Sequence, residues 1–312
     1  MDILITCPPM VGMLSDFERS LAERGLRPTA PPVVQTLSEN ELLELVPGFD
    51  GWIIGDDPAT YRVFEAGRRG RLRAAVKWGV GVDNVDFDAA ARLGIPVANT
   101  PGMFGDEVAD IAMAYVTGLA RETYRIDREV RGGGWPKPRG ISLAGKVVGL
   151  VGFGNIGRCI AHRLIAAGMR VIAYDPLYKP ALGLDPVAHE EWPGGIDTAD
   201  FLVLACALTS ENVHMIGPTL LARVKPGLRV VNVSRGRLID EEALIAALAS
   251  GQVHSAALDV FETEPLPASS PLRGFERCVL GSHNSSNTEE AVRKTSERAI
   301  ELLCGFLQEP LR

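Results

Sequence analysis

KVVGLVGFGNIGRCIAHRLIAAGMRVIAYD, residues Lys146–Asp175, reads as a strand, a glycine turn, a helix and a second strand. The run Val147–Val151 is apolar and rich in β-branched residues, which suits a strand buried on both faces. After the turn, apolar residues recur near helical spacing, and a second apolar run, Val171–Tyr174, leads to Asp175. This order predicts a β-α-β unit with an acidic residue just after its second strand.

The turn contains Gly152, Gly154 and Gly157 in G-x-G-x-x-G spacing. The first glycine allows a tight turn, the second lets the backbone approach a pyrophosphate, and the third lets the helix pack closely on the strand. Asp175 is placed to accept hydrogen bonds from both ribose hydroxyls and to repel a 2′-phosphate, which predicts NAD rather than NADP. Three glycines alone also fit an ordinary loop, but the strand, helix and acid around them favour a dinucleotide site.

Length and composition limit the possible classes of protein. A chain of 312 residues exceeds the size of most single hydrophobic cores, so we expect two domains. A net charge of −7 argues against a nucleic-acid partner. Five scattered cysteines without metal-ligand spacing predict reduced thiols and no metal site in a cytoplasmic protein. No signal peptide is expected, and no apolar run approaches the roughly twenty residues of a membrane span.

Short apolar runs alternate with helical patterns on both sides of this unit, which predicts parallel sheets. The strands expected before it are Asp2–Thr6, Gly51–Ile54, Ala74–Trp78 and Val97–Asn99. The strands expected after it are Phe201–Ala205, Arg229–Val233, Ser255–Asp259 and Cys278–Leu280. A helix is expected at Asp16–Arg24 and a final one at Thr288–Leu307, whereas Asp106–Arg131 is predicted to form one long helix.

Polar or glycine-rich segments follow several of these strands, where ligands bind in open α/β sheets. They include Gly79–Gly81, Arg235, Asp259 with Glu264, and His283. A histidine titrates near neutral pH and can transfer a proton, and a carboxylate beside it can orient the ring. Arginine carries a permanent charge and a planar fork that suits a carboxylate. Each residue also fits a simpler role as a solvated loop side chain or a cap.

Six stretches, taken together in this order, are similar to the D-isomer-specific 2-hydroxyacid dehydrogenases, in the phosphoglycerate dehydrogenase-like branch. They extend through nearly the whole chain and are more specific than the glycine turn alone. They are KWGVGVDNVD (77–86), NTPGMFGDEVAD (99–110), VGFGNIG (151–157), VKPGLRVVNVSRGRLIDEEAL (224–244), ALDVFETEP (257–265) and SHNSSNTEEA (282–291).

The resemblance implies an NAD-dependent enzyme that interconverts a D-2-hydroxy acid and its 2-oxo acid by hydride transfer. Arg235 would bind the substrate, Glu264 and His283 would form the acid–base pair, and the amides of Val80 and Gly81 would hold the substrate carboxylate. The positions that match the family's NAD-binding residues, in addition to the three glycines, are Asn155, Ile156, Asp175, Cys206, Val233 and Asp259.

The resemblance also implies two Rossmann-like doubly wound parallel-sheet domains separated by a cleft. Residues 1–98 plus 285–312 would form a discontinuous substrate-binding domain, and residues 99–284 would form the NAD-binding domain. The long helix at Asp106–Arg131 would help to form a homodimer. Two alternatives share this site: a corepressor-like protein that senses NAD(H) without turnover, and a glyoxylate or hydroxypyruvate reductase.

Departures from the family pattern concern the substrate more than the reaction. Phosphoglycerate enzymes tend to have an Arg-Ser pair at about Gly55–Asp56, whereas here Asp56 and Asp57 bring negative charge to a place expected to face the pocket. Lys77 replaces a frequent arginine. Ser285 and Ser286 replace a pair rich in glycine and alanine. Carboxylates at this place would repel a phosphate. We therefore expect an acid whose distal end is neutral, polar or cationic.

Overall fold

The computed structural model describes residues 1–308, and the chain forms two compact units. The first unit comprises residues 1–103 and the segment that begins at residue 287, and the second comprises residues 104–286. The boundaries expected from the sequence, after residues 98 and 284, lie slightly earlier in the chain. The last residues assigned to the first domain, 309–312, lie outside the described part of the chain.

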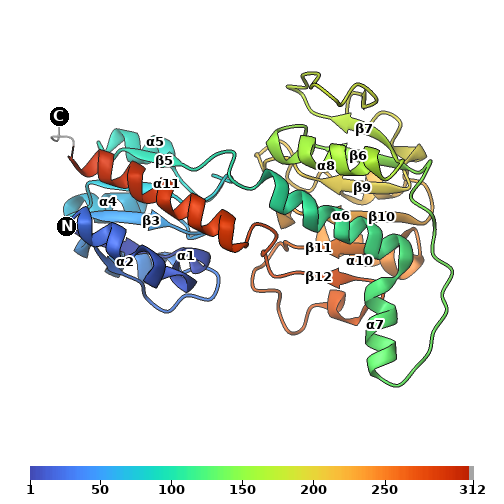
Figure 1. Ribbon diagram of the computed structural model, residues 1–312, viewed down its shortest axis with the longest axis horizontal. Helices are drawn as coiled ribbons and strands as arrows, with labels where there is room; N and C mark the ends of the chain where they lie inside the picture. The colour runs from blue at the N-terminus through green and yellow to red at the C-terminus, as the bar shows by residue number, and fades with distance from the viewer. Residues whose placement is uncertain (309–312) are drawn as a thin grey trace. The chain divides into compact units, whose positions relative to one another are not determined.

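The first unit is a five-stranded parallel sheet with strand order β2-β1-β3-β4-β5 (Figure 1). Its strands are β1 (Asp2–Ile5), β2 (Arg27–Thr29), β3 (Gly51–Ile54), β4 (Ala74–Lys77) and β5 (Val97–Asn99). Its helices are α1 (Pro8–Gly12), α2 (Leu14–Glu23), α3 (Glu39–Leu45), α4 (Tyr61–Arg69), α5 (Phe87–Arg92) and α11 (Glu289–Gln308).

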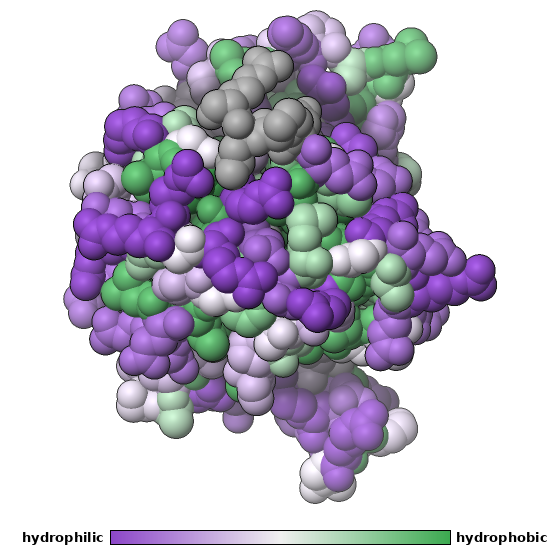
Figure 2. All heavy atoms as spheres, turned by 90° about the vertical axis from the view of Figure 1, so that its left-hand side faces the viewer, coloured by the Kyte–Doolittle hydropathy of each residue, from purple (hydrophilic) through white to green (hydrophobic). Residues whose placement is uncertain are grey.

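Apolar packing on both faces holds this sheet. On one face, Trp52 and Ile54 of β3 pack with Leu42 of α3 and Phe64 of α4. Helix α11 packs against β3 and β4 on the other face, where the indole N–H of Trp78 donates to Ser296 Oγ at 3.1 Å. The outer surface of this unit mixes hydrophilic and hydrophobic side chains, as is usual for a solvated face (Figure 2).

The second unit is a seven-stranded parallel sheet with the order β12-β11-β10-β9-β6-β7-β8. Its strands are β6 (Val147–Val151), β7 (Arg170–Tyr174), β8 (Ala188–His189), β9 (Phe201–Leu204), β10 (Leu228–Asn232), β11 (Val253–Leu258) and β12 (Val279–Leu280). Its helices are α6 (Gly105–Arg121), α7 (Thr123–Arg131), α8 (Asn155–Ala166), α9 (Pro218–Leu221) and α10 (Glu241–Ser250).

Helices also cover both faces of the second sheet. Alternate strand residues, such as Leu202 and Val230, form a core with Leu221 of α9 and Leu244 of α10. Helices α6 and α8 pack together, and α6 contacts β10 and β11 from the other side. The strand order reverses between β6 and β9, as in dinucleotide-binding folds. The predicted class of two Rossmann-like, doubly wound domains is confirmed.

None of the helices within residues 1–308 has the length and apolarity needed to cross a membrane.

Several element predictions were wrong in detail. Pro8 and Pro9 begin α1, a helix that was not predicted, because proline suits the first turn of a helix. The edge strands β2 and β8 were missed because they are short and their side chains are largely exposed.

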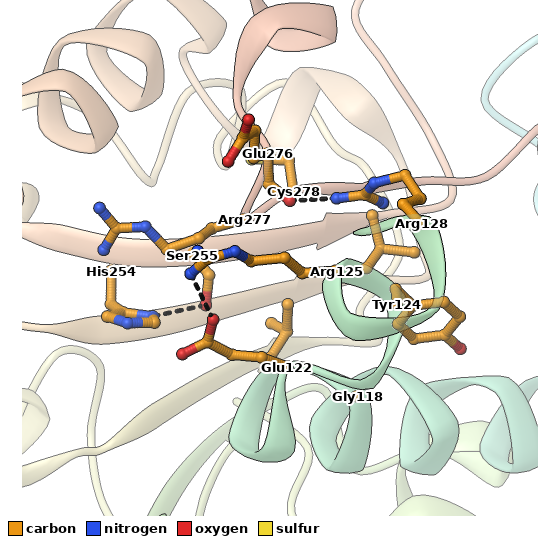
Figure 3. Close-up of a pocket in the computed structure, with 12 residues that line it drawn as sticks. Gly118, Glu122, Tyr124, Arg125, Arg128, His254, Ser255, Glu276, Arg277 and Cys278 are labelled. Carbon is orange, nitrogen blue, oxygen red and sulfur yellow. Dashed lines mark hydrogen bonds and ion pairs between the residues drawn. The ribbon is translucent and has the colours of Figure 1, made fainter. Parts of the chain in front are cut away.

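The stretch Asp106–Arg131 is not one helix. It divides into α6 and α7 at Glu122, whose backbone is left-handed with φ 53°. The break lets the ring of Tyr124 lie against Gly118, where any Cβ would collide with it (Figure 3). Arg125 then pairs with both Glu122 and Glu129. The helix-forming residue types on either side gave no sign of this break.

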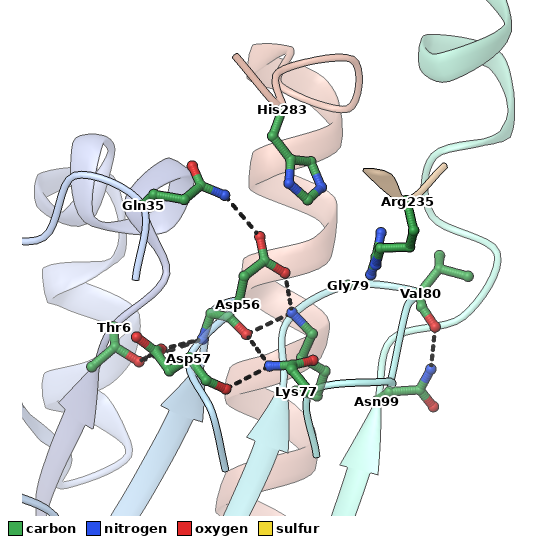
Figure 4. Close-up of polar contacts among 12 residues, drawn as sticks. Thr6, Gln35, Asp56, Asp57, Lys77, Gly79, Val80, Asn99, Arg235 and His283 are labelled. Atoms are coloured by element: carbon green, nitrogen blue, oxygen red, sulfur yellow. Dashed lines mark hydrogen bonds and ion pairs between the residues drawn. The ribbon is translucent and has the colours of Figure 1, made fainter. Parts of the chain in front are cut away.

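The expectation that Asp57 brings negative charge to a substrate pocket is wrong. Its side chain is completely buried and points into the first unit rather than toward solvent (Figure 4). One carboxylate oxygen accepts from Leu37 N at 2.8 Å, and the other accepts from Gly55 N at 3.1 Å and from the Thr6 hydroxyl. Thr6 Oγ1 in turn accepts from the indole of Trp52 at 2.9 Å. Burial raises the pKa of Asp57, and these hydrogen bonds oppose that rise.

Replacing Asp57 with alanine should lower the free energy of unfolding by about 2–4 kcal/mol, because it leaves buried donors on Leu37, Gly55 and Thr6 without their acceptor. Urea denaturation followed by circular dichroism measures this change. Glu18→Ala, at an exposed position on α2, is the control and should stay within about 0.5 kcal/mol of the wild type. Equal stability of the two variants would show that the Asp57 network does not stabilise the fold.

Candidate active site

The glycine turn lies at the point where the strand order of the second sheet reverses. Gly152 follows β6 with φ 96°, and a Cβ there would lie 2.6 Å from the amide nitrogen of Cys206, which comes just after β9. A Cβ on Gly157 would collide with the carbonyl oxygen of Gly152. Only glycine permits these two close approaches, so the turn has the conformation that the sequence predicted.

Helix α8 begins at Asn155, directly after this turn. Its N-cap is Gly154, which provides no side-chain hydrogen bond to the first turn. A Cβ on Gly154 would meet nothing within 4 Å, so the backbone borders open space there. Asn155 is exposed and Ile156 is half-buried. Uncapped N–H groups and a glycine surface suit a pyrophosphate, and the residues present therefore fit a dinucleotide.

Asp175 lies at the end of β7 with both carboxylate oxygens oriented by backbone groups. Oδ2 accepts from Phe153 N at 2.6 Å, and Oδ1 accepts from Leu177 N at 2.8 Å. Each oxygen can accept a further hydrogen bond, so the carboxylate remains able to receive ribose hydroxyls. Its fixed negative charge beside the glycine turn disfavours a 2′-phosphate.

Cys206 and Val233 follow the neighbouring strands β9 and β10. The Ser234 hydroxyl donates to the carbonyl oxygen of Cys206 and joins the two loops. Burial raises the pKa of the Cys206 thiol to about 11, which keeps it neutral at physiological pH. Val233 is buried, with 8% of its surface exposed, so any contact from these loops to a cofactor would come chiefly from backbone atoms and the thiol.

Arg235 lies on the loop after β10, and the side chain of Asn232 organises that loop. Asn232 is completely buried; its Oδ1 accepts from Ser234 N at 3.0 Å and its Nδ2 donates to the Arg235 carbonyl at 2.8 Å. Arg235 is half-buried, whereas Arg237 is exposed. Sequence reasoning missed Asn232, although a polar residue at the end of a buried apolar run indicated a specific hydrogen-bonding role.

His283 and Glu264 are in direct contact, as the sequence predicted for an acid–base pair. His283 Nδ1 lies 2.8 Å from Glu264 Oε2, and the other carboxylate oxygen accepts from Phe261 N at 2.9 Å. The two side chains are 22% and 20% exposed, so solvent reaches the pair while most of its surface is covered. Since Nδ1 faces the carboxylate, proton transfer to or from a substrate would involve the other ring nitrogen, Nε2.

Asp259 is buried and accepts from the segment that carries His283. Asn284 N donates to its Oδ1 at 3.1 Å, and Ser285 N donates to its Oδ2 at 2.9 Å. The Ser285 hydroxyl adds a third donor at 2.5 Å. The predicted contact of Asp259 with a nicotinamide amide stays a prediction, and the structure adds a local role that the sequence did not reveal.

In the first unit, Val80 and Gly81 lie on an open loop after β4. Thr100 Oγ1 accepts from Gly79 N at 2.8 Å, and Asn99 Nδ2 donates to the Val80 carbonyl at 3.2 Å. These contacts hold the loop from the end of β5. Within residues 1–308, the amide N–H groups of Val80 and Gly81 donate to no protein acceptor, which leaves them able to bind an anion.

Asp56 and Lys77 form an ion pair next to this loop. Lys77 Nζ lies 2.9 Å from Asp56 Oδ1 and donates to the Gly55 carbonyl at 2.6 Å. The Lys77 side chain is 3% exposed and that of Asp56 is 33% exposed. Gln35 Nε2 donates to the other Asp56 oxygen at 3.2 Å (Figure 4). Asp56 is therefore partly exposed, and its charge is partly balanced by Lys77.

No group of three His, Cys, Asp or Glu side chains in the described chain, residues 1–308, is arranged to hold a metal ion. The five thiols are all free.

Comparison with known proteins identifies the family of this chain. Residues 113–285 match the family model for the D-isomer specific 2-hydroxyacid dehydrogenase, NAD binding domain. A glyoxylate reductase of Korarchaeum cryptofilum is 35% identical, over 92% of this chain and 91% of that protein. A hydroxypyruvate reductase of Thermotoga maritima is 37% identical, over 85% of this chain and 87% of that protein.

The structure is similar to that of an NAD-dependent formate dehydrogenase from Staphylococcus aureus in complex with NAD. The TM-score is 0.86 with 26% identity, and the match covers 100% of this chain and 97% of the other. The predicted cofactor, NAD, and the predicted enzyme class are confirmed. On the family match and the identity of its relatives, this chain belongs to the D-isomer-specific 2-hydroxyacid dehydrogenases, the NAD-dependent oxidoreductases that act on CH–OH donors.

Proposed function

We propose that the chain reduces a small, singly charged 2-oxo acid to its D-2-hydroxy acid, with His283 as the proton donor in this direction. The observation that carries this assignment is the 2.8 Å contact between His283 Nδ1 and Glu264. A carboxylate fixed by Phe261 N orients the imidazole through Nδ1. When bound, NAD supplies or accepts the hydride.

The other residues of the proposed site bind the substrate and the cofactor. Arg235 binds the substrate carboxylate and its neighbouring oxygen, since a guanidinium can donate two parallel hydrogen bonds. The open amides of Val80 and Gly81 also hold the carboxylate. Gly152, Gly154, Asn155, Ile156 and Gly157 hold the pyrophosphate, and Asp175 holds the ribose. Cys206, Val233 and Asp259 complete the cofactor site.

The substrate class follows from the first unit. Lys77 is already paired with Asp56 and donates to Gly55, so it is poorly placed to bind a second anion. The partly exposed Asp56 carboxylate repels a distal phosphate. Glyoxylate and hydroxypyruvate carry one negative charge and a small neutral group at the other end. They are also the substrates that the names of two relatives indicate, which supports this choice.

We further propose that the enzyme is a homodimer through α7 and the segment after it. Helix α7 has no buried residue, although Ile126 and Val130 lie on one face four residues apart. Val130 is 40% exposed and Trp135 is 79% exposed. Next to α7 lies a pocket whose lining includes Arg125, Arg128 and Glu276 (Figure 3). A second copy would cover this apolar face and meet these charges.

A cytoplasmic location is part of the same proposal, because five free thiols fit a reducing compartment. Cell fractionation checks it, and recovery of the protein outside the cytoplasm would contradict it.

Replacing His283 with alanine should lower kcat about 10²–10⁴-fold, because it removes the proton donor and leaves the cofactor groups in place. Steady-state turnover with NADH measures this, and fluorescence titration should give an NADH Kd within about threefold of the wild type. His162→Ala changes an exposed histidine of α8 and should not alter kcat. Unchanged turnover in His283→Ala would refute the assigned role.

Wild-type enzyme should prefer glyoxylate or hydroxypyruvate to 3-phosphohydroxypyruvate by at least about tenfold in kcat/KM, because Asp56 repels the phosphate. Asp56→Asn should lower this ratio of kcat/KM values by about threefold or more. Asp88→Asn, at an exposed position on α5, should leave the ratio unchanged. NADH oxidation with the three acids measures both ratios. A wild-type preference for the phosphorylated acid would contradict the proposed substrate class.

Sedimentation equilibrium should give the wild type a mass of twice 33.5 kDa. Val130→Asp should shift the mass toward that of one chain, because it introduces a charge into the apolar face of α7. Leu182→Asp changes a leucine that is 98% exposed in the same unit and should leave the dimer intact. A wild-type mass of one chain at micromolar concentration would show that α7 has another purpose.

A further inference from the structure

The backbone of His283 is held in a conformation that side chains seldom adopt. Its φ is 55°, in the left-handed region that disfavours residues with a Cβ. His283 comes shortly after β12, which pairs with β11, so its loop lies beside the residue that ends β11, Leu258. Such a conformation persists only where surrounding contacts enforce it, and it is common at functional sites.

The contacts that enforce it come from Leu258 and Asp259. The Leu258 carbonyl accepts from Gly281 N at 2.7 Å, and the Asp259 carbonyl accepts from His283 N at 2.7 Å. The Asp259 carboxylate then accepts from Asn284 N and Ser285 N, the next two residues. The backbone on both sides of the His283 ring is thus tied to the end of β11.

Gly281 permits this arrangement because a Cβ there would collide with Asp259 Oδ1 and lie 2.7 Å from the Tyr115 hydroxyl oxygen. Burial, and then the nearby charge of Asp259, raise the pKa of Tyr115, so its hydroxyl stays protonated. Asp259 is therefore packed in a narrow space, with 3% of its surface exposed.

Ser285 reaches this carboxylate with both its backbone and its side chain. Its hydroxyl donates to Asp259 Oδ2 at 2.5 Å, and the residue is 6% exposed. Any residue except proline would supply the backbone N–H at this position, whereas the hydroxyl comes from the side chain of Ser285. The bond also lies next to the end of the second unit, because the chain passes to the first unit after Ser286.

The partner of the imidazole depends on the same part of the chain. Glu264 is held by Phe261 N, two residues after Asp259, and it contacts His283 Nδ1. Hydrogen bonds to residues 258–261 therefore position both His283 and Glu264. Loss of the Ser285 hydrogen bond would let the loop of His283 move. The imidazole would then shift relative to Glu264, whose carboxylate keeps its position.

We infer that Ser285, through its hydrogen bond to Asp259, is a positioning residue that holds His283 in the orientation needed for proton transfer. This inference rests on the proposed role of His283. The side chain acts on the histidine loop and does not touch the reacting atoms. It assigns a function to a serine that stands where the family pattern favours glycine and alanine.

The test compares Ser285→Ala with Ser255→Ala, a second buried serine of the same unit whose hydroxyl contacts His254. Ser285→Ala should lower kcat about tenfold, with KM and the NADH Kd within twofold of the wild type. Its melting temperature should match that of Ser255→Ala, which should keep wild-type kcat. Ser285→Thr, which retains the hydroxyl, should recover much of the lost kcat.

The double variant identifies the route of the effect. If Ser285 acts through His283, adding Ser285→Ala to His283→Ala should leave the residual turnover unchanged. A further tenfold loss in that background would overturn the inference, as would a kcat within twofold of wild type in Ser285→Ala alone. Weaker NADH binding with unchanged kcat would also overturn it. Full activity of His283→Ala is a separate result that refutes the proposed function itself.

Discussion

A Cβ on Gly152 would lie 2.6 Å from the amide nitrogen of Cys206, and this close approach fixes the centre of the second unit. It lets the chain leave β6 beside the end of β9, at the point where the strand order reverses. Helix α8 can then begin at Asn155 with its first N–H groups directed at the same edge. Asp175, after the adjacent β7, is held by Phe153 N from within the turn. The cofactor site is therefore a consequence of backbone packing more than of particular side chains.

The loops of Arg235 and His283 also depend on the edge of the second sheet where its strands end. In a parallel sheet, all strands end at one side, so the residues that follow them are neighbours even when they are distant in sequence. Asn232 ends β10 and Asp259 directly follows β11, and the Asn232 carbonyl accepts from Asp259 N. Asn232 organises the loop of Arg235, and Asp259 organises the loop of His283. Two buried polar side chains thus act as local supports for two half-buried functional groups.

Much of this could be predicted from the sequence. The glycine spacing, the apolar runs and the six family stretches predicted two parallel-sheet units, NAD and the contact of Glu264 with His283. The missing parts depended on tertiary contacts that have no local pattern. Glu122 looks like any helical residue, yet the ring of Tyr124 against Gly118 requires a break there. Asp56 and Asp57 are chemically identical neighbours, and only the fold shows that Asp57 is a buried acceptor while Asp56 meets solvent.

That difference between Asp56 and Asp57 explains how related enzymes can share a fold and differ in substrate. The matched relatives named for glyoxylate, hydroxypyruvate and formate share this architecture, so the architecture alone does not choose the acid. The glycine turn and the supports at Asn232 and Asp259 belong to the second unit, whereas Asp56 belongs to the first. The charge of a residue next to the loop of Val80 and Gly81 can vary without disturbing the glycine turn or the supports at Asn232 and Asp259, provided that a counter-ion balances it. In this chain Lys77 is nearly inaccessible to solvent, and its pairing with Asp56 balances a buried cation while it leaves a carboxylate facing outward. An arginine at position 56 would meet Lys77 as a like charge, so replacing Asp56 in this chain also removes the counter-ion of Lys77.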